Sequence, residues 1–218
     1  MDLTRSFSYI FDDEDWASKV VLMAIISIIP ILNLAVYGWL IELMRNMLHG
    51  YDTPMPDWSN FGEKFGAGLA YVVAAFIYNL VAIVFMIPII AVGALTENTA
   101  MEALGVALAC ILSVFIIAYL VVANAGLLIG MIRYALNPVM ASYLDIGENL
   151  RIALRHAGTL LTMVLFMLLV AIIFSVLGMI PCIGWLIALA LGTPVYAHLI
   201  GQAAIMIVGR EKRKRAAA

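Results

Sequence analysis

The polar side chains inside the apolar stretches of this sequence raise the first question about its chemistry. His198 is a titratable residue well inside such a stretch, and Asn33, Asn79, Asn124 and Gln202 lie in similar surroundings. A histidine there could be a proton relay or a ligand; we favour a neutral histidine bonded to a neighbouring helix. Amide side chains buried in lipid need partners, and such bonds contribute about 0.6–2 kcal/mol each. We expect the amides to hold helices together, with a polar cavity as the alternative.

Motifs typical of enzymes and metal sites are missing from the sequence. It contains no glycine-rich phosphate loop, no nucleophile elbow and no HExxH motif. Its two cysteines, Cys110 and Cys182, are far apart and lack CxxC spacing. Interleaved aromatic and basic residues for nucleic acid are also missing. We therefore expect no catalytic, cofactor or metal site, no enzymatic activity and no nucleic-acid partner.

The loop at residues 50–66 is the most distinctive polar stretch. Pro56 fixes the backbone there, Gly62 allows a close approach, and Asp57 is suited to capping a turn through a backbone N–H. Trp58 and Phe61 are three residues apart, so they would face the same way on one helical turn. We expect an ordered cytoplasmic loop that wedges between the first apolar stretch and the following helix, as a structural or docking element.

Composition places the chain in the membrane. Of its 218 residues, 65% are hydrophobic and 12% are charged, whereas soluble domains have about 45–50% apolar and about 25% charged residues. We expect an all-α, polytopic helical bundle that forms a single membrane domain over residues 1–218.

The apolar stretches lie at 20–41, 67–87, 104–132, 159–180 and 185–208. An Ile-Pro pair recurs at Pro30, Pro88 and Pro181. Residues 181–184 offer the turn between the last two stretches, and Pro88 stands at the end of another. By analogy Pro30 marks a turn as well. We expect three helical hairpins, the first short or broken at Pro30, with a single crossing by residues 20–41 as the alternative.

The remaining segments are expected at the membrane surface. Residues 1–19 mix aromatic and acidic side chains, as in the headgroup region, and residues 137–157 read as an amphipathic connector. A basic tail occupies residues 209–218. Its cations are suited to anionic lipid headgroups: Arg210, Lys212, Arg213, Lys214 and Arg215.

Three stretches together resemble a known family. These are FSYIFDDEDW, SIIPILNLAVYGWLIELMRNMLHG and MPDWSNFGEKFGAGL. They are similar to uncharacterised prokaryotic integral membrane proteins, catalogued as a domain of unknown function (number 4013). The loop motif from Met55 to Gly62 is the most specific part, and Trp39 replaces the usual tyrosine after Gly38. The resemblance implies an all-helical fold in a prokaryotic cell membrane and implies no activity.

Two functions fit these observations. A non-enzymatic scaffold or accessory subunit would pair its amides within a dry interior and bind other membrane subunits or a second copy. A transporter or channel for a small neutral or lipidic solute would show a polar cavity reaching the midplane, lined by Asn79, Asn124 and Gln202. We favour the scaffold because the apolar stretches hold so few charges.

Charge also predicts the sidedness of the chain. Basic residues in short loops mark the cytoplasmic side, and every basic segment lies inside if residues 20–41 enter and return. Reporter fusions at Ser6 and Ala218 should therefore both report the cytoplasm. Opposite sides would favour a single crossing by residues 20–41.

Overall fold

The computed structural model of the protein describes residues 1–95, 99–180 and 184–216, without the side chains of 88, 89, 91–95, 99–104 and 215. The described chain is mostly helical and contains no strands. Its elements in order are α1 (Leu3–Ser8), the 3-10 helix η1 (Tyr9–Asp12), α2 (Trp16–Ile28), α3 (Leu34–His49), α4 (Phe61–Leu95), α5 (Thr99–Leu136), α6 (Ala141–Leu144), α7 (Ile146–Arg155), α8 (Ala157–Gly178) and α9 (Gly184–Ala216).

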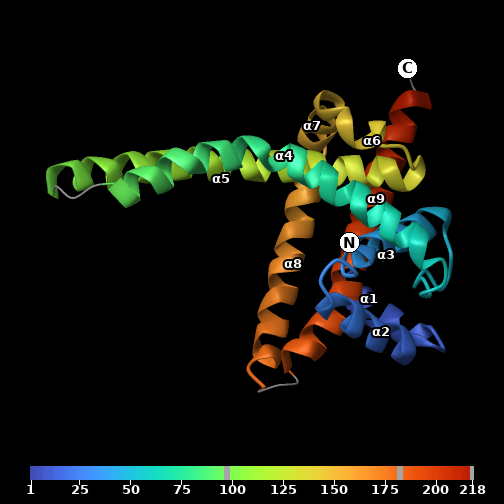
Figure 1. Cartoon of the computed structure of the whole chain (residues 1–218). Helices are drawn as coiled ribbons and strands as arrows, with labels where there is room; N and C mark the ends of the chain where they lie inside the picture. The colour runs from blue at the N-terminus through green and yellow to red at the C-terminus, as the bar shows by residue number, and fades with distance from the viewer. Residues whose placement is uncertain (96–98, 181–183, 217–218) are drawn as a thin grey trace.

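Two long helical pairs organise the molecule. In Figure 1, α4 and α5 run side by side as an arm that projects from the rest, while α8 and α9 form a second pair that runs in another direction. Each of these helices is long and apolar enough to cross a membrane, which makes four candidate spans among the described residues. The helical membrane bundle predicted from composition is confirmed.

The break at Pro30 is confirmed as well. A turn separates α2 from α3, and Ile31 within it has a left-handed φ of 72°. With 13 residues, α2 is shorter than the roughly 20 that a span needs. Pro88 behaves differently: α4 continues through it to Leu95, so it marks no turn. The turn expected at Pro181 falls on 181–183, outside the described residues.

A close approach of two helix backbones joins α3 to α4. A Cβ atom added to Gly38 would overlap the carbonyl group of Lys64, and one added to Gly68 would overlap the carbonyl group of Leu34. Only glycine leaves room for two helix backbones at this distance. These two glycines therefore set how α4, and with it the arm, leaves the bundle.

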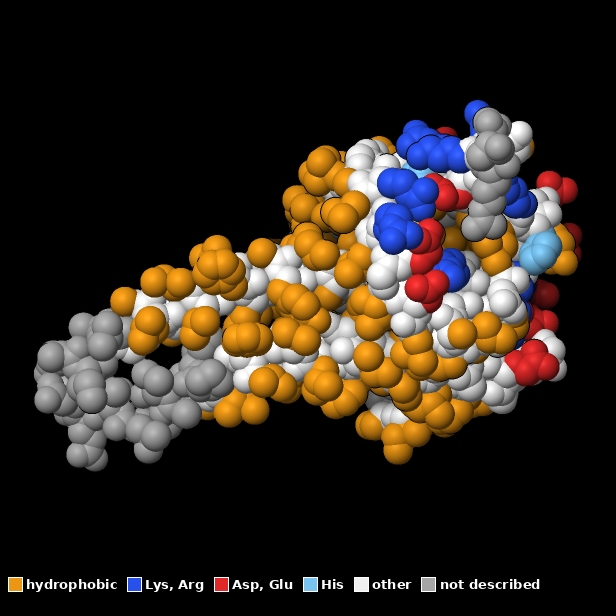
Figure 2. All heavy atoms as spheres, turned by 90° about the horizontal axis from the view of Figure 1, so that it is seen from above, with side chains coloured by type: hydrophobic (Ala, Val, Ile, Leu, Met, Phe, Trp, Pro, Cys, Tyr) orange, Lys and Arg blue, Asp and Glu red, His pale blue; other side chains and the backbone are white. Residues whose placement is uncertain are grey.

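The core lies where the helices converge, and the arm is its exposed extension. One buried cluster joins α3, α4, α5, α7 and α9, and a second joins the N-terminal segment to α3, α8 and α9. Apolar side chains cover the arm in Figure 2, whereas charged side chains gather at the opposite end of the molecule. This distribution suits helices that face lipid.

Replacing Gly38 by alanine should destabilise the protein. The new Cβ meets backbone, which cannot move aside as a side chain can, so we expect a loss of about 1–3 kcal/mol or more. Gly66→Ala is the matched control on α4, because a Cβ there meets nothing within 4 Å. That control should be neutral or stabilising by up to about 1 kcal/mol. Thermal melting in detergent measures both, and equal melting would contradict the close contact.

Candidate functional site

The loop between α3 and α4 is tied to its neighbours by two tryptophans. Trp39 of α3 is 1% exposed and donates its indole N–H to the carbonyl of Pro56 at 2.9 Å. Trp58 is half-buried, stacks on Trp39 with ring centroids 6.2 Å apart and donates to the carbonyl of Lys19 at 3.0 Å. The loop thus fastens α2 to α3.

The detail of the loop differs from the prediction. Because α4 begins at Phe61, the loop ends at residue 60 instead of 66, and Gly62 is helical. Asn60 has a left-handed φ of 50°, so Trp58 and Phe61 do not share one helical turn. The stacking and the hydrogen bond of Trp58 are instead made with α3 and α2.

Asp57 closes a turn within the loop. Its carboxylate accepts the backbone N–H of Ser59 at 2.9 Å and the Ser59 hydroxyl. The hydroxyl hydrogen bond is the largest influence and lowers the pKa of the Asp57 carboxyl. Burial, the next largest, raises it, and the backbone hydrogen bond and the nearby Lys64 lower it further, so that the net shift is downward. The expected N–H contact is present, but it closes a turn that is not helical.

Lys64 is the buried cation of this region. Its side chain is 2% exposed, and Nζ lies 2.8 Å from Glu42 Oε2. The same ammonium donates to the carbonyl of Ser59 at 2.7 Å. A buried charge persists only when it is paired and hydrogen-bonded, so the ion pair belongs to the α3–α4 contact that Gly38 permits. Lys64 was not among the site residues predicted from the sequence.

A surface cavity of about 450 Å³ adjoins this ion pair. It lies between α3, the first turns of α4 and the end of α5. Polar side chains from all three elements line it: Glu42, Arg45, Asn46, Glu63, Lys64 and Tyr134. The cavity is located where α4 begins its span and α5 ends its own, so it belongs to one face of the bundle.

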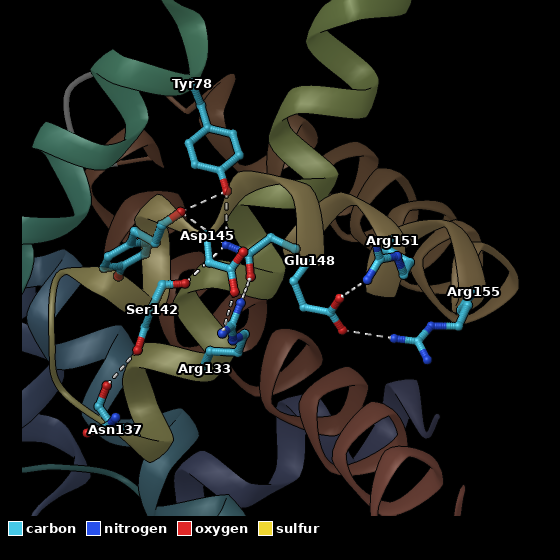
Figure 3. Close-up of polar contacts among 10 residues, drawn as sticks. Tyr78, Arg133, Asn137, Ser142, Asp145, Glu148, Arg151 and Arg155 are labelled. Carbon is cyan, nitrogen blue, oxygen red and sulfur yellow. Dashed lines mark hydrogen bonds and ion pairs between the residues drawn. The ribbon is translucent and has the colours of Figure 1, made fainter. Parts of the chain in front are cut away.

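The connector is organised around Asn149, which is fully buried. Its amide nitrogen lies 3.0 Å from the Tyr78 hydroxyl and from the carbonyls of Ser142 and Tyr143. Arg133 of α5 donates to its amide oxygen at 2.6 Å and lies 3.1 Å from Asp145 (Figure 3). One asparagine therefore joins α4, α5, α6 and α7.

Within the predicted connector at 137–157 lie helices α6 and α7, whose buried face is partly polar. Tyr143 and Asn149 are buried, while Leu144 is 47% and Leu154 is 69% exposed. Asn149, Ile152 and Ala153 follow the spacing of one helix face, which could have identified the asparagine. Burial raises the pKa of the Tyr143 phenol.

His198 belongs to a buried cluster that fixes the N-terminal segment to α9. Its Nδ1 lies 3.0 Å from Ser6 Oγ and 3.1 Å from Gln202 Nε2. Gln202 also binds the backbone of Asp2, accepting its N–H at 2.6 Å and donating to its carbonyl at 2.8 Å. Tyr9 stacks on the imidazole with ring centroids 4.2 Å apart. The expected helix-bonded histidine is thus found, with Ser6 as a partner that the sequence did not indicate.

The other predicted amides are Asn79 and Asn124, which form a pair, and Asn33; Asn124 and Asn33 are both exposed. Asn124 donates to Asn79 Oδ1 at 3.3 Å, and both also donate to carbonyls of their own helices, those of Leu120 and Ala75. The pair joins α5 to α4. Asn33 is exposed in the turn before α3, so it does not join helices in the described structure.

The basic tail is a continuation of α9. Lys212, Arg213 and Lys214 are exposed on it, Arg210 donates to Thr159 Oγ1 at 3.1 Å, and the side chain of Arg215 is outside the described residues. Glu211 lies 2.8 Å from the buried His156 and 3.5 Å from Arg155. These contacts hold the end of α9 against α7 and α8.

The described residues contain no group of three His, Cys, Asp or Glu side chains placed to hold a metal. Ser6 and His198 are a possible nucleophile and base by type, but they are 0% and 5% exposed. Their environment therefore suits a structural role. Polar side chains that line a surface cavity are found instead beside Lys64.

Trp58→Ala should lower the melting temperature more than Trp16→Ala. Removing Trp58 loses a stacked ring and an indole hydrogen bond, which we expect to cost about 2 kcal/mol or more, whereas Trp16 packs against Phe11, whose side chain is 61% exposed. Trp58→Phe keeps a ring and should fall between. Similar melting of all variants would show that the loop is only a tether.

The sequence matches a protein family described as "Protein of unknown function (DUF4013)" over residues 22–183. No curated protein and no solved structure matches the chain. The matched region includes the α2–α3 turn, the tryptophan loop, the arm and the connector. The chain therefore belongs to this family of proteins of unknown function.

Proposed function

We propose that the protein is a non-enzymatic scaffold or accessory subunit of a membrane complex. The observation that carries the proposal is the use of interhelical polar groups within the chain. Asn79 and Asn124 bond across α4 and α5, and Gln202 and His198 bond to Ser6. A path for solute would need such groups free to exchange partners, whereas here they hold segments together.

The arm supports the same role. Apolar side chains more than half exposed follow both of its helices, among them Phe76, Val84, Val114, Phe115 and Ile117. Such a surface packs equally well against lipid chains and against apolar helices, because neither requires hydrogen bonds. The partners we propose are other membrane subunits or a second copy of the chain.

The basic end of α9 provides the proposed contact with anionic headgroups. Lys212, Arg213 and Lys214 extend from a span, and Arg151 is exposed on neighbouring α7. Each cation near an anionic surface contributes about 1 kcal/mol. We propose the prokaryotic plasma membrane as the location, with this end in the cytoplasm.

A transporter for a small neutral or lipidic solute is the alternative. The observation in its favour is the polar cavity at one end of the α4 and α5 spans. The two functions differ in whether water reaches the amide pair between α4 and α5, which a thiol reagent can test.

In a variant lacking Cys110 and Cys182, a cysteine at position 79 or 124 should resist a membrane-impermeant maleimide applied to both faces of a nanodisc. Apolar surroundings exclude the reagent and disfavour the reactive thiolate. Ser59→Cys, in the exposed loop, is the matched control and should react quickly.

Native mass spectrometry of protein extracted in mild detergent should also show the chain together with a second copy or another subunit.

Reaction at 79 and 124 as fast as at 59 would contradict a dry interior and favour the transporter. A chain that is always detected without a partner, while both cysteines stay unreactive, would contradict the scaffold proposal without favouring the transporter. The two measurements therefore separate the hypotheses.

A further inference from the structure

The cavity beside Lys64 contains an unusual balance of charge. Lys64 and Glu42 neutralise each other at 2.8 Å. Arg45 donates Nε to the carbonyl of Ala135 at 3.0 Å, which leaves its other N–H groups for a ligand. Within the described part of the chain, neither Arg45 nor Glu63 has an oppositely charged side chain within 4.0 Å. One uncompensated cation and one uncompensated anion thus line the same cavity.

These two charges match a ligand that carries both signs. Guanidinium N–H groups bind phosphate oxygens in a planar, bidentate geometry, while a carboxylate accepts hydrogen bonds from an ammonium group. Tyr134 also lines the cavity, and an aromatic face attracts a cation. The volume of about 450 Å³ is within the range of small-ligand sites.

An apolar stripe leads away from the cavity along α4. Gly66 lines the cavity, and Leu69, Val73, Phe76 and Leu80 follow it at the spacing of one helix face. Their side chains are between 43% and 58% exposed. A ligand whose charged head occupied the cavity could lay an acyl chain on this stripe, at the level where the span of α4 begins.

We propose that the cavity binds an amine–phosphate zwitterion, with the phosphate on Arg45 and the amine on Glu63. This is the chemistry of a phosphoethanolamine headgroup, and the apolar stripe favours its lipid form over the free compound. The site is separate from the basic end of α9, which faces anionic lipid, and it does not depend on the scaffold role.

Native mass spectrometry of delipidated protein can test this with phosphatidylethanolamine and phosphatidylglycerol as probes. The wild type should bind phosphatidylethanolamine more tightly. Arg45→Gln should weaken its binding about tenfold or more, as the loss of a charge-assisted hydrogen bond predicts. Glu63→Gln should abolish the preference for the amine while phosphatidylglycerol binding stays or rises. Arg5→Gln is the control, because Arg5 pairs with Asp12 and does not line the cavity, and it should change neither.

Glu63 is exposed, so its variant should fold even where Arg45→Gln does not, and thermal melting checks both. Melting with free phosphoethanolamine distinguishes the source: a stabilisation that both cavity variants lose would support the site with a soluble ligand. Equal binding of the two lipids by the wild type and Glu63→Gln would overturn the proposal. Binding of neither the lipids nor the free compound would overturn it as well.

Discussion

The contact between the backbones of α3 and α4 is the constraint on which the other interactions depend. Glycines at 38 and 68 bring the helices so close that the carbonyls of Lys64 and Leu34 occupy the space of a side chain. This proximity places Lys64 over Glu42 and buries its charge. Arg45 of α3 and Glu63 of α4 line the cavity that adjoins this ion pair. The absence of side chains at Gly38 and Gly68 therefore determines where the charged side chains of α3 and α4 lie at this end of the bundle.

Polar side chains then connect segments that are distant in sequence. Gln202 and His198 bind the N-terminal segment to the last helix, and Asn149 joins the connector to the arm. Buried polar groups are costly when unpaired, so each of these clusters favours one arrangement of the helices over alternatives that an apolar bundle would tolerate. The polar groups therefore contribute to the specificity of packing.

The sequence predicted the features that depend on local pattern. Apolar length gave the spans, and the Ile-Pro pair before Asn33 gave the break between α2 and α3. The same reasoning failed at Pro88, because a proline in a long apolar helix can be accommodated when the rest of the helix continues to be favourable. Lys64 and Ser6 were missed because their partners are set by helix crossings and by the fold of the N-terminal segment, which no local pattern encodes. The sequence predicted that Asn79 and Asn124 hold helices together. That they bond to each other follows only from the packing of α4 against α5.

The lengths of the spans have a mechanical consequence. The apolar part of α8 has 22 residues and that of α5 has 32, or about 33 and 48 Å, against a hydrocarbon layer of about 30 Å. The second exceeds this layer by more than the first does, so it needs tilt or projection beyond the layer. This hydrophobic mismatch couples the protein to bilayer thickness. In a thicker membrane the arm would stand more steeply, and its rotation would act on the bundle through the glycine crossing at its base.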